Sequence, residues 1–123
     1  MYEDEDTIAF LDVYPLSKGH TLVIPKVHVG QIEELSQRNF ETLFKTVWKL
    51  TKSVQLATGA TSSLIGINNG PESGQEIPHV HVHIIPRSKG DGGGPIHATM
   101  PKRPNISKQE MQKVAERIVH GLR

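Results

Sequence analysis

The sequence predicts an α+β domain in which an antiparallel sheet packs with one long helix and a C-terminal helix. Two observations support the sheet: short runs of β-branched and aliphatic residues are bounded by Gly and Pro, and several runs stand at hairpin distance. A third supports the helices, because apolar residues recur at three- and four-residue steps in two longer segments. The length of 123 residues predicts a single domain, 1–123.

The first half of the chain predicts two strands and the long helix. Residues 1–6 are acidic and predict an opening turn, and the runs 7–13 and 20–25 predict strands joined by a turn rich in Pro and Gly. A loop with one helical turn follows over 27–35. Apolar periodicity then predicts a helix over 37–58, and its aromatic residues are expected to face the core rather than a ligand: Phe40, Phe44 and Trp48.

The second half predicts two more strands, over 63–68 and 78–86, with a polar loop over 69–76 between them. The core is therefore expected to span 1–88, followed by a Gly/Pro-rich, mobile connector over 89–106 and a helix over 107–123. Ser107 is the expected N-cap of that helix, in a Ser-x-x-Glu capping box with Glu110. Four strands make a small sheet with exposed edges, so we expect a homodimer to cover them.

The fourth predicted strand carries three histidines at every second position. His79, His81 and His83 alternate with aliphatic residues, which is the period of a strand, so all three imidazoles are expected to leave one face of it. A solvated face readily explains one such histidine but poorly explains three in register. The array is therefore a candidate functional site.

Composition excludes several classes of function. The formal net charge is +1 and no Arg-rich run is present, so a dedicated nucleic-acid binder is disfavoured. The absence of cysteine removes disulfides, thiolate nucleophiles and cysteine-ligated metals, and it fits a cytoplasmic protein. No long apolar run predicts a membrane span or a signal peptide.

Several imidazoles without thiols favour phosphoryl or nucleotidyl transfer, because neutral imidazole is a good nucleophile toward phosphorus and its neighbours can donate hydrogen bonds to phosphate. The loop before the histidines adds Ser73, Gly74 and Gln75 as candidate phosphate contacts. A divalent-metal enzyme that uses the three histidines with His20 is an alternative, but no carboxylate pattern supports it. We therefore expect no metal and no cofactor.

Residues 79–85, His-Val-His-Val-His-Ile-Ile, resemble the His-x-His-x-His-x-x signature of the histidine triad family of nucleotide hydrolases and transferases. The resemblance covers about residues 2–86, and further segments match in order: 9–12, 19–26, 68–70 and 74–75. It implies a histidine triad fold completed as a two-fold dimer. It also implies hydrolysis at the α-phosphate of a purine nucleoside 5'-phosphoramidate or a dinucleoside polyphosphate, with release of a nucleoside monophosphate such as AMP.

The resemblance implies roles for the matched residues. His81 is the implied nucleophile, which forms a nucleotidyl-histidine intermediate that water hydrolyses. His83 contacts the phosphate or the scissile bridge, and it indicates a hydrolase because transferase branches typically carry Gln there. His79 and His20 position or polarise the site. The implied nucleotide-binding residues are Asp12 at the ribose, Phe10, Leu11 and Val13 around the base, and Asn68, Gly74, Gln75 and Glu76 at the phosphates and leaving group.

The chain departs from the family at two points. Many members carry an N-terminal segment with a Cys-x-x-Cys pair, and zinc-binding members join those cysteines with histidines that here are His28 and His79. The cysteines are missing, so no zinc is predicted. Glu76 stands where some relatives have Ser or Thr, and it acts as an acid only if its surroundings keep it protonated. A nucleotide-binding or interaction module with little turnover is the alternative function.

Overall fold

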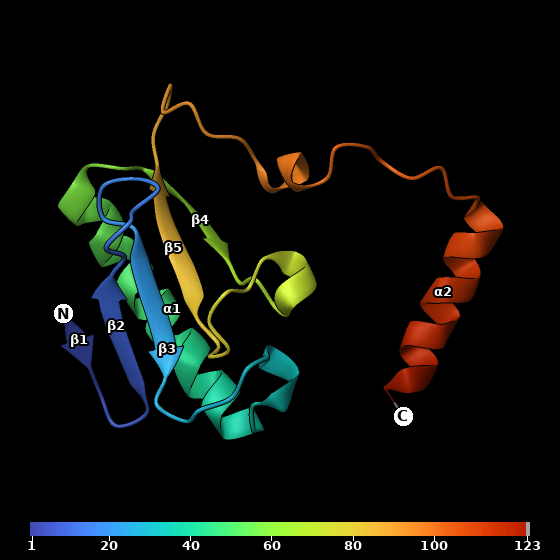
Figure 1. The fold of residues 1–123 in the computed structure, drawn as a ribbon, viewed down its shortest axis with the longest axis horizontal. Coiled ribbons are helices and arrows are strands. Elements are labelled where there is room, and N and C mark those ends of the chain that lie inside the picture. Colours follow the sequence, from blue (N-terminus) through green and yellow to red (C-terminus); the bar gives the residue numbers. More distant parts are fainter. Residues whose placement is uncertain (123) are drawn as a thin grey trace. The chain divides into compact units, whose positions relative to one another are not determined.

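The computed structural model describes residues 1–122, and it confirms the α+β class (Figure 1). Five antiparallel strands form one sheet in the order β1-β2-β3-β5-β4. The chain forms two compact units, Met1–Gly93 and the part from Gly94 onward. The strands are β1 Tyr2–Glu3, β2 Thr7–Leu11, β3 Thr21–Pro25, β4 Ser62–Gly66 and β5 Val82–Arg87; the α-helices are α1 Gln37–Thr58 and α2 Lys108–Gly121; the 3-10 turns are η1 Ile32–Glu34, η2 Pro71–Ser73 and η3 Ile96–Thr99.

The main difference from the predicted elements is β1, which forms where the sequence predicts only a turn. β1 pairs antiparallel with β2, with Tyr2 opposite Ala9. The side chain of Tyr2 packs against the core, and the carboxylate of Asp4 accepts the backbone N–H groups of Asp6 and Thr7 in the turn that follows. The opening segment is thus held by strand pairing, by the apolar contact of Tyr2, by the Asp4 carboxylate and by an ion pair between Glu3 and Lys26 at 2.7 Å.

The hydrogen bonds to Asp4 make the stability of the opening segment depend on pH. Desolvation raises the pKa of Asp4, but hydrogen bonds from Asp6, Thr7 and Tyr2 outweigh it and lower the pKa from 3.8 to about 2. The stabilisation is therefore complete above the unfolded pKa of 3.8 and is lost as the pH falls toward 2. We expect Asp4→Asn to lower the free energy of unfolding by about 1 kcal/mol at neutral pH.

Urea unfolding of wild type and Asp4→Asn at neutral pH and at about pH 2.5 measures this effect. The difference in unfolding free energy is expected to shrink at the lower pH, because the carboxylate of the unfolded chain, with its ordinary pKa of 3.8, is protonated there while the native carboxylate begins to be. Glu5→Gln, which removes a carboxylate from the same turn, is the control. If the difference in unfolding free energy between wild type and Asp4→Asn is equal at both pH values, the ionised carboxylate of Asp4 does not stabilise the opening segment.

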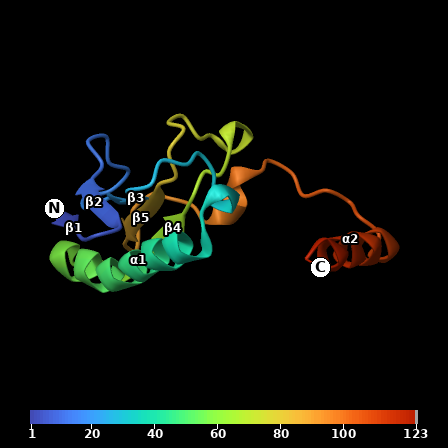
Figure 2. The same ribbon diagram turned by 90° about the horizontal axis from the view of Figure 1, so that it is seen from below.

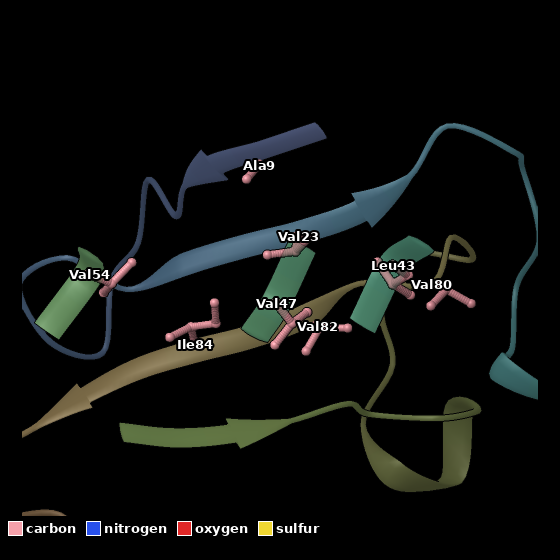
Figure 3. Close-up of a cluster of buried hydrophobic side chains, with 8 residues drawn as sticks. All are labelled: Ala9, Val23, Leu43, Val47, Val54, Val80, Val82 and Ile84. Carbon is pink, nitrogen blue, oxygen red and sulfur yellow. The ribbon is translucent and has the colours of Figure 1, made fainter. Parts of the chain in front are cut away.

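Helix α1 forms as predicted and covers one face of the sheet (Figure 2). The hydroxyl of Ser36 accepts the N–H of Asn39 at 3.1 Å at its start, and Gly59 ends it in the left-handed conformation with φ 77°. The core lies between α1 and the strands (Figure 3), and its buried residues are Ala9, Val23, Leu43, Val47, Val54, Val80, Val82 and Ile84.

The alternation of side chains along the strands assigns each residue to one face of the sheet. Val23, Val82 and Ile84 are fully buried toward α1, whereas Leu22 and His83 lie opposite each other in register on the other face. The strand predicted over 78–86 is shorter, since β5 begins at Val82 and the first two triad histidines precede it. The predicted alternation of buried aliphatic residues with imidazoles is nevertheless present from Val80 onward.

The predicted core position of Trp48 is wrong. Its side chain is 77% exposed, and Phe40 is 42% exposed, whereas Phe44 packs partly against the core. The face of α1 toward the sheet is already filled by its buried aliphatic residues, so Trp48 lies farther around the helix. Trp48 and Ile65 of β4 line a shallow apolar hollow between the helix and the edge strand.

The segment after β5 begins with a hydrogen-bonded turn and is otherwise irregular apart from η3; the mobility expected for 89–106 stays a prediction. Asp91 accepts two hydrogen bonds from the guanidinium of Arg87, at 2.7 and 3.0 Å, and the backbone N–H groups of Ser88 and Gly93. In the second unit, α2 begins after Ser107, whose hydroxyl accepts the N–H of Glu110 as predicted. Within residues 1–122, neither helix is long and apolar enough to cross a membrane.

Candidate active site

A cavity of about 770 Å³ lies on the face of the sheet that α1 does not cover, within the first unit. It gathers most of the predicted site residues, which come from β2, the loops around it and the segment that leads into β5. Its lining residues are Phe10, Leu11, Asp12, Val13, Tyr14, Leu22, Ile24, Asn68, Gly74, Glu76, Ile77, His79, His81 and His83.

Four of these lining residues were not predicted from the sequence. Leu22 and Ile24 alternate with the buried residues of β3 and pair with residues on the cavity face, so the strand period alone could have identified them. Tyr14 and Ile77 lie on loops, and no sequence pattern indicates their direction.

The loop before the triad is held by the side chain of Gln75. Its amide donates to the carbonyls of Gly30, at 2.7 Å, and Ile77, at 3.0 Å, and it accepts the N–H of Gly70 at 2.8 Å. The hydroxyl of Ser73 donates to the carbonyl of Gly70 at 2.9 Å. Neither Ser73 nor Gln75 lines the cavity, so their contacts with phosphate stay a prediction.

Gly74 lies in the cavity wall with φ 93°, where a side chain is strained. A Cβ at this position would stand 3.0 Å from the amide nitrogen of Asn68. Glycine therefore lets the backbone of the loop approach Asn68, and the two residues form one wall of the cavity.

The hydrogen bonds around His81 determine which of its nitrogens can react. Its Nδ1 lies 2.8 Å from the carbonyl oxygen of His79, and because a carbonyl only accepts, Nδ1 carries the hydrogen. The neutral ring therefore keeps an unprotonated Nε2. The ring of His79 is occupied at both nitrogens: Nε2 donates to the carbonyl of Pro25 at 2.9 Å, and Nδ1 accepts from Nδ1 of His28 at 3.0 Å. The ring of His79 is thus held by Pro25 and His28, and its backbone carbonyl fixes the orientation of the His81 ring.

Hydrogen bonds give His20 and His83 the opposite tautomer from His81, with the hydrogen on Nε2 instead of Nδ1. The backbone N–H of Leu16 donates to Nδ1 of His20 at 3.1 Å, so the hydrogen of the neutral His20 ring is on Nε2. That N–H donates to Nδ1 of His83 at 2.8 Å. His83 is thereby fixed with its own hydrogen on Nε2, so it offers a donor to the cavity that it lines.

Burial favours the neutral forms of His20 and His83. It lowers the pKa of His20, with the Asp12 carboxylate 3.7 Å away acting in the opposite direction. Burial also lowers the pKa of His83, helped by the neighbouring rings of His81 and His20 and opposed by Asp12. The site thus combines a free lone pair on Nε2 of the neutral His81 ring with an N–H donor on Nε2 of His83, and the two ring centroids lie 5.1 Å apart.

The histidines do not fit a structural zinc ion, which takes four ligands. His28 and His79 stand at the position of a family zinc site, but no third candidate ligand joins them among the described residues. Within residues 1–122, Asp12, His20 and His83 are the only three candidate ligands close together, and there the shared hydrogen bond uses one nitrogen of each ring. The absence of zinc stays a prediction.

Comparison with known proteins gives consistent matches. The HIT domain family model matches residues 1–90. The chain is 38% identical over 112 residues to adenosine 5'-monophosphoramidase hnt1 of Schizosaccharomyces pombe, covering 91% of this chain and 79% of the relative. It is 40% identical over 90 residues to the asymmetrical bis(5'-nucleosyl)-tetraphosphatase of the same organism, covering 73% of this chain but only 50% of the relative. A crystal structure of a HIT family member from Bacillus subtilis superposes with a TM-score of 0.84 at 33% identity, covering 98% of this chain and 84% of that one.

Proposed function

Because the chain belongs to the HIT domain family, we propose that it is a nucleotidyl hydrolase acting at the α-phosphate of a purine nucleoside 5'-phosphoramidate or a dinucleoside polyphosphate. The observation that carries the proposal is the pair of opposite tautomers, with a free lone pair on His81 and a donor N–H on His83. The two S. pombe relatives, named as a phosphoramidase and a tetraphosphatase, support hydrolysis.

The reaction proceeds in two displacements at phosphorus. In the first, Nε2 of His81 attacks the α-phosphorus, a P–N bond to His81 forms, and the bond to the leaving group breaks with its electron pair going to that group. In the second, water attacks the same phosphorus, the P–N bond to His81 breaks, and a nucleoside monophosphate is released. The N–H of His83 stabilises the negative charge that develops on the phosphoryl oxygens or the bridging atom.

The cavity can accommodate the nucleotide. Its volume of about 770 Å³ falls in the range of small-molecule sites. We propose that Asp12 binds the ribose hydroxyls, that the apolar side chains at positions 10, 11 and 13 enclose the base, and that Asn68 and the backbone of Gly74 contact the phosphate.

The proposal is tested by separate incubations with adenosine 5'-phosphoramidate and diadenosine tetraphosphate, with AMP quantified by chromatography and AMP binding measured by calorimetry. AMP release from either substrate at many turnovers per site supports a hydrolase. AMP binding without AMP release from either substrate overturns the proposal and favours a nucleotide-binding module.

We also propose that a second copy of the chain covers the hollow beside α1. β4 pairs only with β5, so its outer edge is open within the described residues, and the exposed Trp48 and Ile65 lie next to it. Pairing of two copies along this edge extends the sheet and buries both side chains. This accounts for an apolar surface that the monomer leaves exposed.

Trp48→Glu is expected to shift the protein from dimer to monomer at micromolar concentration, because a carboxylate buried at such an interface lacks a partner. Light scattering after size-exclusion chromatography measures the mass. Ile96→Glu, an exposed apolar position in the second unit, is the control and should leave the mass unchanged. A wild-type protein that is monomeric at high concentration contradicts the dimer.

A further inference from the structure

The walls of the cavity have an acidic balance of charge. Asp12 and Glu76 both line it, and no Lys or Arg does so within residues 1–122. His83 adds little positive charge, since burial lowers its pKa and its neighbours His81 and His20 lower it further. A ligand with several negative charges therefore finds donors here but no Lys or Arg partner among the described residues.

The two carboxylates come from different segments of the cavity wall. Asp12 follows β2 and stands 3.7 Å from His20, whereas Glu76 lies on the loop that connects η2 to the triad. The exposed carboxylate of Glu76 has no hydrogen bond or ion pair with the described residues. If the nucleoside occupies the side of Asp12, as the proposed function requires, Glu76 faces the phosphate and the leaving group.

We infer that Glu76 is a specificity-determining residue that directs the site toward phosphoramidates whose leaving amine carries a positive charge, and away from polyphosphate leaving groups. This inference rests on the proposed function. Sites that cleave polyphosphate chains neutralise the departing charge with Arg, Lys or a metal ion, and the lining of this cavity offers a carboxylate instead. An ionised Glu76 accepts hydrogen bonds from an amine and attracts an ammonium group nearby, whereas it repels phosphate.

The first displacement with such a substrate needs one proton from solvent and no other reactant. The bond from phosphorus to the substrate nitrogen breaks as the bond to Nε2 of His81 forms. The departing nitrogen keeps the electron pair, takes a proton from solvent and leaves as an amine. Glu76 exchanges no proton in this step and acts only through its charge and its hydrogen bonds.

Three adenosine substrates isolate the effect of charge. The first is the phosphoramidate of ethylenediamine, whose free amine is an ammonium group at neutral pH; the second is the nearly isosteric phosphoramidate of propylamine, which is neutral at that position; the third is diadenosine tetraphosphate. AMP release is measured in low salt with EDTA, so that neither screening nor Mg²⁺ masks the charge of the leaving group.

Wild type is expected to favour the cationic over the neutral phosphoramidate by about tenfold in kcat/KM, and Glu76→Gln is expected to reduce this ratio to about one. The same substitution should raise the kcat/KM for the tetraphosphate, relative to the neutral phosphoramidate, by about tenfold. Glu72→Gln removes a carboxylate from the same loop but outside the cavity lining, so it should leave both ratios as in wild type.

Ratios that stay the same in Glu76→Gln, with AMP still released, overturn the role of Glu76 while the proposed hydrolase stands. An equal change in Glu72→Gln also overturns it, because the effect then belongs to the charge of the whole loop. If wild type releases AMP from none of the three substrates, the proposed function fails and this inference fails with it.

Discussion

Replacing His81 by alanine is expected to lower kcat/KM for adenosine 5'-phosphoramidate by about 10⁴-fold or more, because the substitution removes the attacking nitrogen. The remaining groups of the site can still bind the nucleotide, so the affinity for AMP should change far less than turnover. Steady-state AMP release and calorimetric AMP titration measure the two quantities.

The His81 variants need a check on folding and a matched histidine control. His81 is only half buried, so both His81→Ala and His81→Gln are expected to keep the wild-type unfolding midpoint within a few degrees. His97→Ala removes an exposed histidine from the second unit and should retain full activity. A His81 variant that folds and keeps more than about a tenth of the wild-type kcat/KM would show that another group attacks phosphorus.

Removing His20 is expected to lower kcat by about 10²-fold with a smaller change in KM, although His20 does not line the cavity. The reason is the tautomer of His83: without the N–H of His20, nothing keeps the Nδ1 of His83 as an acceptor and its Nε2 as the donor. His20→Gln restores an N–H donor at this position and should recover part of the loss in kcat.

The pH profile separates this positioning role from a merely structural one. In wild type, protonation of His83 contributes to the acid limb of kcat/KM, and the lowered pKa of His83 places this contribution below the ordinary value of 6.5. Protonation of His83 puts a hydrogen on both ring nitrogens and breaks the bond from His20, so activity falls as the pH falls through that pKa. His20→Ala removes one cause of the lowered pKa, and the limb should move to higher pH. A variant with reduced kcat but an unmoved acid limb would indicate a structural role alone.

The sequence was sufficient for the fold class because hydrophobic periodicity distinguishes strands from helices. It failed for β1, since the two residues Tyr2–Glu3 are too few to show a period. It also failed for Trp48, because a helical stripe of apolar residues shows that a surface is covered but not by which partner. The stripe of α1 that faces the sheet and the face that carries Trp48 are adjacent on the helix.

Most of the predicted site residues line the cavity, but the direction of the hydrogen bonds between the histidines was not predicted. The period of two identified the triad, and the family resemblance added residues of the loops. The tautomers of His81 and His83 could not be predicted, because they depend on hydrogen bonds to backbone groups and to His20, which is far from His83 in sequence. The contact of the Gln75 side chain with Gly30 could not be predicted for the same reason, since Gly30 belongs to a loop distant in the sequence.

The most direct measurement of the central claim is the intact mass of the protein, rapidly mixed with adenosine 5'-phosphoramidate and quenched without acid, with peptide mapping of any adduct. The proposed mechanism predicts a transient adenylyl group on His81, more abundant in His83→Ala, where its hydrolysis is slowed, and absent from His81→Ala. AMP release by wild type without an adduct on His81 in either wild type or His83→Ala would contradict covalent catalysis by this histidine.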